Sequence, residues 1–396
     1  MSLDKVCLIP WVSVSTHPAG FVSRCMMSTE PMGTMSDPDV WDNNNFIELR
    51  KDMVAGTWNL PGCKTCHDRE EQGLVSQRLN WKTNERWWNG DLWDTIDFKE
   101  SLTGNKIYHL FLNTNNLCNF KCRMCNSTYS NSWILDDQLL IQNGIKRHAH
   151  FDNVKNRNNL IEFITLQKDK LSDVRLITVT GGEPFINNDL LDALSLLDLS
   201  NVHLSITTNG SLLTEEHLVK LSSAKKVNIN ISIDGTGKLF EYMRSDNQCT
   251  WQTINSKISM LRNFAKEHNN FVFSPNASFQ LYNMLNIAEF YDWAEQLIVR
   301  PHEWIEFRLL SHPQYLNVAI APDTIKDRCM QQINYVEQTY PANKYFLDNM
   351  KRALNIKLSE RDKLWSEFQK FTTVLDSKRS QNIENVCPEL YEYFTV

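Results

Sequence analysis

Three cysteines in the middle of the chain, Cys118, Cys122 and Cys125, are spaced C-x3-C-x2-C. Three thiolates at this spacing can bind three corners of an iron–sulfur cube, and the fourth iron then has no protein ligand. An open iron can bind a substrate or cofactor directly, which a fully ligated electron-transfer cluster cannot do. The spacing therefore indicates a cluster that takes part in chemistry. A zinc site that lacks its fourth ligand and three buried thiols are the alternatives.

Four further cysteines lie near the N-terminus: Cys7, Cys25 and the C-x2-C pair Cys63 and Cys66. Four thiolates would close the coordination shell of a second metal centre, which favours electron transfer or structural support over substrate binding. Cysteine pairs at C-x2-C are equally typical of zinc sites. This segment therefore predicts a metal-bound module, and both iron–sulfur and zinc stay open as the metal.

The other three cysteines stand alone. We predict that Cys249 and Cys329 are ordinary buried thiols, and we leave Cys387 open as a replacement for one N-terminal ligand. His67, beside Cys66, is predicted to be a surface neighbour of the metal module. Ten cysteines in 396 residues are too sparse for a disulfide scaffold, and the N-terminal sequence lacks the pattern of a secretory signal. We therefore expect a cytoplasmic protein.

Regular elements that could position these cysteines lie between about residues 105 and 310. Apolar, β-branched runs alternate there with amphipathic stretches that are typical of helices. Six strand–helix units in a row predict a parallel sheet, either open or curved into a partial barrel. The predicted strands are 107–113, 174–180, 202–207, 227–233, 271–279 and 304–310, and the predicted helices include 160–171, 188–198, 214–223, 250–267 and 287–297.

Short polar motifs follow several of the predicted strands. The three-cysteine loop comes after the first strand, and the sequence TGGEP at 180–184 follows the second. Residues 207–210 read TTNG and residues 232–235 read SIDG. Ligands bind at the carboxyl ends of parallel strands, so these motifs lie where chemistry is expected. Taken alone, Gly-Gly before proline is also a common turn.

Together, the C-x3-C-x2-C loop and the GGEP motif make residues 105–310 resemble the radical S-adenosylmethionine (radical SAM) enzymes. The resemblance implies a 4Fe–4S cluster on Cys118, Cys122 and Cys125, whose open iron binds the amino and carboxylate groups of SAM. One electron then cleaves the sulfonium to give a 5′-deoxyadenosyl radical, which abstracts hydrogen from a substrate. The family usually has an aromatic residue before the third cysteine, and this chain has Met124.

The same resemblance implies a set of residues that orient SAM. Met124 would line the adenine site, Glu183 would accept a hydrogen bond from the ammonium, and Arg244 would pair with the carboxylate. An ordinary solvated charge is the alternative for Arg244. The full set of predicted cofactor-binding residues is Met124, Gly181, Gly182, Glu183, Ser232 and Arg244.

The N-terminal cysteines resemble the opening of the SPASM and twitch domains, which hold auxiliary iron–sulfur clusters. Cys7, Gly20 and Cys25 fit the pattern C-x(9–15)-G-x4-C. One auxiliary 4Fe–4S cluster, as in a twitch domain, is the better match because the further cysteines of a full SPASM domain are missing. The order departs from those domains, since the cysteines here precede the barrel. A structural zinc site is the alternative.

These observations predict an α/β fold with a partial (β/α)6 TIM-like barrel. We expect a loop-rich iron–sulfur module at 1–104, the radical SAM partial barrel at 105–315 and a helical extension at 316–396. The chain has no apolar run of membrane length. Its net charge of −6 offers no basic field for a long nucleic acid, although a local patch stays open.

For function, the resemblance implies a flavodoxin or ferredoxin as electron donor and a peptide or protein side chain as substrate. Trp87, Trp88 and Trp93 could line a peptide groove, or pack the N-terminal module onto the barrel. Two alternatives stay open. One is a radical SAM enzyme that acts on RNA or a small nucleotide, and the other is a non-catalytic iron–sulfur or zinc protein.

Overall fold

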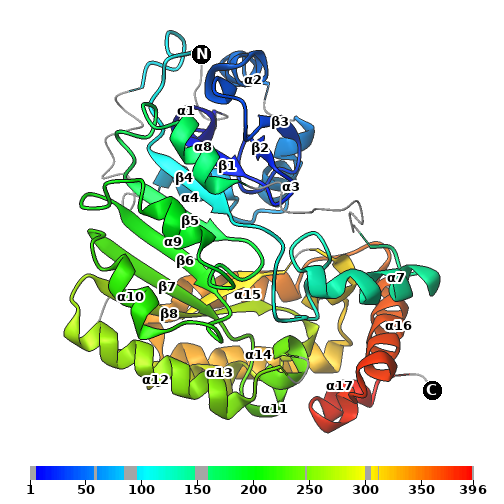
Figure 1. Cartoon of the computed structure of the whole chain (residues 1–396). Helices are drawn as coiled ribbons and strands as arrows, with labels where there is room; N and C mark the ends of the chain where they lie inside the picture. The colour runs from blue at the N-terminus through cyan, green and yellow to red at the C-terminus, as the bar shows by residue number, and fades with distance from the viewer. Residues whose placement is uncertain are drawn as a thin grey trace. The chain divides into compact units, whose positions relative to one another are not determined.

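The computed structural model describes residues 6–57, 60–83, 96–147, 159–245, 248–298, 305–310 and 312–394. Its strands form one nine-stranded sheet in the order β3-β2-β1-β4-β5-β6-β7-β8-β9 (Figure 1). The strands are β1 (Ser13–Thr16), β2 (Phe21–Ser23), β3 (Pro31–Thr34), β4 (His109–Asn113), β5 (Leu176–Thr180), β6 (His203–Thr208), β7 (Lys226–Ser232), β8 (Phe271–Phe279) and β9 (Glu306–Leu309).

Strands β4 to β9 are the six strands that the sequence predicted. Neighbouring strands along the chain lie side by side, and β4–β5, β5–β6 and β8–β9 pair in parallel register. Helices follow the strands, including α8 (Leu160–Leu166), α9 (Asp189–Leu194), α10 (Glu215–Leu221), α12 (Trp251–Glu267) and α13 (Ile287–Glu295). The sheet is open and mostly parallel, so the predicted α/β fold class with a partial barrel is confirmed.

Compact packing divides the chain into two units, each built from several segments. The first contains 1–116, 153–207 and 219–228, and the second contains 117–152, 208–218 and 229–396. The predicted domain limits near residues 104 and 315 stay a prediction. Trp87, Trp88 and Trp93 lie outside the described residues.

The first unit contains three strands that the sequence analysis did not predict. β1 pairs with β2, and β2 with β3, in antiparallel register, while β1 runs parallel to β4. Each of these strands is only three or four residues long, so it depends on pairing with its neighbours. The helices of this N-terminal segment are α1 (Ile9–Val12), α2 (Asn44–Val54), α3 (Lys64–Glu71) and α4 (Gln77–Thr83).

The core of the first unit lies along β4 and β5. All five residues of β4 are buried, and its three central residues are apolar in succession instead of alternating with polar ones. Leu110, Leu112, Ile177 and Val179 are at most 1 % exposed. This packing fixes the carboxyl ends of both strands, after which the predicted motifs begin.

The second unit contains α7 (Ile134–Gln142) and the helices of the C-terminal part of the chain. Besides α12 and α13, these are α11 (Gly237–Phe240), α14 (Asp323–Thr339), α15 (Lys344–Leu354), α16 (Arg361–Arg379) and α17 (Pro388–Tyr391), together with a short π-helix, Glu241–Ser245. The predicted helical C-terminal region is present. Within the described part of the chain, no helix has both the length and the apolar composition needed to cross a bilayer.

Candidate active site and metal centres

The three-cysteine loop follows β4 in the chain and is closed by local hydrogen bonds in the second unit. The Cys125 N–H donates to the Cys122 carbonyl over 2.8 Å. Ser132 Oγ donates to the Cys118 carbonyl over 2.7 Å, and Trp133 Nε1 donates to the Cys122 carbonyl over 3.0 Å. Ser132 and Trp133 belong to a 3-10 turn, Asn131–Trp133, that leads into α7. The loop backbone is therefore fixed by the segment that follows it.

The thiols of this loop influence one another electrostatically. Burial raises the pKa of Cys125, and negative charge on Cys122 and Cys118 raises it further. Burial also raises the pKa of Cys122, while the guanidiniums of Arg244 and Arg379 act to lower it. Thiols bind metal as thiolates, so a cationic surrounding favours ligation. The three thiols thus influence one another electrostatically, and two arginines favour the ligating form of Cys122.

Arg244 provides a direct test of whether the loop fits SAM. Its side chain is buried in the π-helix and forms an ion pair with Asp234, and its Nε is buried without a hydrogen-bond partner. An unsatisfied cationic donor is costly in a protein interior unless a ligand completes it. A carboxylate, such as that of SAM, would satisfy this donor. The residues present in the second unit therefore fit the cofactor that the sequence predicts.

In the first unit, the Gly181–Gly182 turn is packed against the end of β4. Gly181 has φ of +138°, and a Cβ at this position would lie 2.5 Å from Thr114 Oγ1 and 2.8 Å from the Thr114 amide nitrogen. The Gly182 N–H donates to the Asn115 carbonyl over 2.7 Å. Glycine at these two positions would let the backbone approach a ligand. The structure adds a nearer reason, which is the close contact with the chain leaving β4.

The remaining predicted cofactor residues lie near strand ends or in the cysteine loop. Glu183 is fully buried in the first unit, where its Oε1 accepts a hydrogen bond from the Phe185 N–H over 3.2 Å. In the second unit, Ser232 ends β7 and Met124 lies in the cysteine loop, and both are half-buried. Their contacts with SAM stay a prediction.

The four N-terminal cysteines gather in the first unit. Burial raises the pKa of Cys7, and the charges of Cys25, Cys63 and Cys66 raise it further. Burial raises the pKa of Cys25 to about 12, again with contributions from Cys63 and Cys66. The fold therefore brings together four thiols that are separated by up to 59 positions in the sequence, from Cys7 to Cys66.

Arg24 provides the corresponding test of fit for a metal centre at these four thiols. Burial raises the pKa of Cys63, and the adjacent Arg24 guanidinium opposes that rise. Arg24 Nε and Nη1 are buried and lack a partner at ordinary hydrogen-bond geometry, while the guanidinium interacts with the Cys63 thiol and forms an ion pair with Glu30. A thiolate centre carries negative charge, which these donors would satisfy. The donor set suits an anionic tetrathiolate centre, of iron–sulfur or of zinc.

A small cavity extends from these cysteines to the sheet. Cys7, Cys25 and Cys66 line it together with Trp81 and His109. His109 begins β4, is fully enclosed, and shares hydrogen bonds with Ser13 Oγ (2.8 Å) and Thr178 Oγ1 (3.0 Å). Burial lowers the pKa of His109 to about 3, so this imidazole is neutral at physiological pH.

The predicted burial of Cys249 and Cys329 is confirmed. The two residues are 5 % and 0 % exposed. Cys387 lies in the second unit and donates its S–H to the Tyr282 carbonyl over 3.3 Å. His67 lies on α3 near Asp68 and Glu71, at the half-exposed surface of the first unit.

Several residues near both cysteine sets escaped the sequence analysis. Arg24 and Arg123 each adjoin a cysteine, and that adjacency was the only signal available. Asp234 lies inside the SIDG motif, where its ion pair with Arg244 could have been anticipated. Arg379 is far along the chain and gave no signal.

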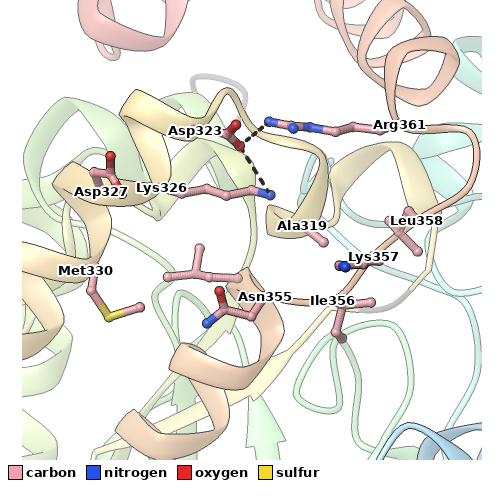
Figure 2. A pocket seen from close by; sticks show the side chains of 11 residues that line it. Ala319, Asp323, Lys326, Asp327, Met330, Asn355, Ile356, Lys357, Leu358 and Arg361 are labelled. Atoms are coloured by element: carbon pink, nitrogen blue, oxygen red, sulfur yellow. Dashed lines mark hydrogen bonds and ion pairs between the residues drawn. The ribbon is translucent and has the colours of Figure 1, made fainter.

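A separate cavity of about 550 Å³ lies among the C-terminal helices (Figure 2). Lys326 and Arg361 converge there on the Asp323 carboxylate, at 4.0 and 2.7 Å. The Asp323 side chain is 78 % exposed, so these are surface ion pairs. None of the residues predicted to bind a cluster or SAM lines this cavity.

Comparison with known proteins decides what the central part of the chain is. Residues 112–272 match the Radical SAM superfamily. These residues form a radical SAM domain. The prediction drawn from the cysteine loop and GGEP is therefore confirmed for this domain. The domain is that of the radical SAM class of enzymes, and it implies a 4Fe–4S cluster and SAM.

Similarity to curated proteins covers about a third of the chain. GTP 3′,8-cyclase of Aliarcobacter butzleri is 28 % identical over 137 residues, which are 34 % of this chain and 37 % of that protein. The GTP 3′,8-cyclase of Photorhabdus laumondii is 26 % identical over 159 residues, 35 % and 41 % of the two chains. That of Rhodopirellula baltica is 29 % identical over 133 residues, 33 % and 32 % of the two. Each match spans well under half of the relative.

A solved structure also aligns with the chain. It is the crystal structure of Streptococcus suis SuiB bound to precursor peptide SuiA, with a TM-score of 0.38 and 16 % identity. The alignment covers 84 % of this chain and 71 % of that chain.

Proposed function

We propose that this chain is an enzyme that binds SAM beside Cys118, Cys122 and Cys125 and cleaves it reductively. The observation that carries the proposal is the buried Arg244, which has an unsatisfied Nε and influences the Cys122 thiol within a radical SAM domain. A bound 4Fe–4S cluster would supply the electron for cleavage. The chain itself holds the three thiolates and orients the cofactor.

The family resemblance implies that two residues of opposite charge bind the methionine end of SAM. Arg244 would donate to the carboxylate through the Nε that no protein group satisfies. Glu183 would accept from the ammonium through its fully buried carboxylate. The family resemblance implies that the site is completed by Gly181, Gly182, Ser232 and Met124.

We further propose that Cys7, Cys25, Cys63 and Cys66 hold one auxiliary 4Fe–4S cluster. Mutual electrostatic effects among the four thiols and the buried donors of Arg24 support a shared anionic centre. Iron and zinc analysis of anaerobically purified protein tests this. About eight irons per chain support two clusters, whereas four irons with one zinc would replace the auxiliary cluster by a zinc site.

As substrate we propose a peptide or protein side chain, oxidised, cross-linked or epimerised at an unactivated carbon. The resemblance of the N-terminal cysteines to twitch domains supports this assignment, and the net charge of −6 speaks against a long nucleic acid. A flavodoxin or ferredoxin would be the electron donor.

A small nucleotide is the second candidate substrate. One observation favours it: the curated relatives are GTP 3′,8-cyclases, whose name states GTP as the molecule acted on. Their similarity covers about a third of this chain, and the N-terminal cysteine module is outside the matched radical SAM region at 112–272.

One experiment separates the two substrates. Reconstituted protein with SAM and reductant is incubated in deuterated buffer with peptides encoded beside its gene, and separately with GTP and with tRNA. The variant with Cys118, Cys122 and Cys125 replaced by alanine is the control. Mass spectrometry should show a mass change in a peptide that the control lacks. A change confined to GTP or tRNA would refute the peptide assignment.

A further inference from the structure

Helix α16 packs against α7 within the second unit (Figure 1), and two of its side chains contact the three-cysteine loop. Arg123 follows the predicted ligand Cys122, and its guanidinium is fully buried. It forms an ion pair with Asp376 on α16, 253 positions later in the chain, and donates to Gln381 Oε1 over 2.8 Å. The loop is thus joined to α16 through Arg123, which lies between the predicted ligands Cys122 and Cys125.

The surroundings of this ion pair hold both charges in one geometry. Arg123 Nε donates to the Tyr242 carbonyl over 3.1 Å, and the guanidinium carbon lies 3.6 Å from the centre of the Tyr242 ring. Asp376 accepts hydrogen bonds from the Tyr242 hydroxyl over 2.9 Å and from the Ile383 N–H over 2.8 Å. An ion pair that is buried and hydrogen-bonded in this way has little freedom to shift.

A second buried ion pair joins the last turn of α16 to α7, and its arginine also reaches the cysteine loop. Arg379 donates from Nε and Nη2 to Asp136 on α7, over 3.1 and 2.8 Å, and both side chains are at most 2 % exposed. Arg379 Nη1 also donates to the Lys121 carbonyl over 2.8 Å. Its guanidinium lies 4.7 Å from the ring of Trp133, which in turn donates to the Cys122 carbonyl.

Buried ion pairs contribute little net stability compared with apolar packing, but they specify geometry. Here Asp376 is paired with Arg123 of the loop, while Arg379, which is paired with Asp136 on α7, also donates to the Lys121 carbonyl. We propose that α16 is a positioning element of the three-cysteine loop. Asp376 and Arg379 hold residues 121–123 so that the three thiols face one centre. The proposal rests on the proposed function, because it assigns that centre to the cluster loop.

Position 379 adds an electrostatic contribution. Arg379 Nη1 donates to the carbonyl of Lys121, the residue before Cys122, so its positive charge lies beside this ligand. A cation beside a cluster ligand also favours the reduced, more negative cluster. Arg379 therefore affects both the geometry of the loop and the reduction potential of its cluster.

The test uses full-length chain with Asp376→Asn and with Arg379→Gln. Matched controls on exposed positions of the same helix are Asp362→Asn and Lys378→Gln. Hydrogen exchange of cluster-free protein is followed at the backbone amides of residues 118–125. We expect exchange there to become at least tenfold faster in both test variants, while the amides of β8 and both controls keep wild-type rates.

A second readout follows the electronic consequence. The midpoint potential of the reconstituted loop cluster should become more negative in Arg379→Gln. A tenfold decrease in the equilibrium constant for one-electron reduction of the cluster corresponds to a shift of about 59 mV. Arg379→Lys, which keeps the charge, should restore most of that potential. A purely structural contact would not distinguish lysine from glutamine in this way.

Two outcomes overturn the proposal. Unchanged exchange at 118–125 in both test variants would mean that α16 does not hold the loop. Faster exchange throughout the second unit, β8 included, would mean that these residues only stabilise the fold. Neither outcome depends on SAM cleavage, so wild-type protein that fails to cleave SAM would refute the proposed function without reproducing either result.

Discussion

Replacing Arg244 by methionine should weaken SAM binding. Methionine keeps most of the apolar stem and removes the guanidinium. In the wild type this group is paired with Asp234 on one side, and its buried Nε has no protein partner. The proposed partner of that Nε is the SAM carboxylate. The substitution therefore removes a hydrogen bond that the protein alone does not make.

The size of the effect follows from the kind of bond that is lost. A hydrogen bond to a charged group contributes about 1.5–3 kcal/mol, and about 1.4 kcal/mol corresponds to a tenfold change in affinity. The Kd of SAM for reconstituted protein, measured by equilibrium dialysis, should rise about 10- to 150-fold. Lys238→Met is the matched control, because Lys238 is exposed on the neighbouring helix α11. Its Kd should match that of the wild type.

Cluster assembly gives an independent readout of the same residue. Arg244 acts to lower the pKa of Cys122, so its removal lets that pKa rise further. The thiol must lose its proton to bind iron, and the pH at which half of the iron is incorporated should therefore be higher in Arg244→Met. An unchanged Kd together with an unchanged pH midpoint would refute the reasoning and reduce Arg244 to a partner of Asp234.

Three further predictions concern the other residues of these sites. Glu183→Gln keeps the shape and removes the charge, so the Kd of SAM should rise about 10- to 100-fold with iron content intact; an unchanged Kd would make GGEP only a turn. Alanine at Cys118, Cys122 and Cys125 together should leave about half of the iron and abolish SAM cleavage, and complete loss of iron with zinc retained would contradict the auxiliary cluster. Because burial lowers the pKa of His109 from 6.5 to about 3, the unfolded chain binds a proton first as pH falls. The free energy of unfolding in urea should then decrease below pH 6.5, by up to about 1.4 kcal/mol per pH unit, and His109→Gln should flatten that slope.

The parallel strands were predictable because their environment leaves a clear pattern. Strands buried on both faces are rich in apolar residues, as the centres of β4 and β5 are, so their runs stood out between helical stretches. Strands β1 to β3 carry no such signal. They are three or four residues long, and their place beside β4 depends on pairing that no local pattern records.

The same contrast holds for the site. Ligand spacing is local, so the C-x3-C-x2-C loop and the GGEP motif could be found in the sequence. The charges around the loop are not local: Asp376 meets Arg123 across 253 positions, and Arg379 reaches the Lys121 carbonyl across 258. A buried arginine and a solvated one look alike in a sequence, and only the fold separates Arg24 and Arg123 from surface charges.

Reductive cleavage of SAM is the central claim, and the nucleoside product measures it most directly. Anaerobically reconstituted protein is incubated with SAM and a low-potential reductant, and 5′-deoxyadenosine and methionine are quantified by mass spectrometry. The account predicts both products in equal amounts from the wild type and neither from the variant with alanine at Cys118, Cys122 and Cys125. Wild-type protein that carries its iron and binds SAM, yet forms no more 5′-deoxyadenosine than that variant, would contradict it.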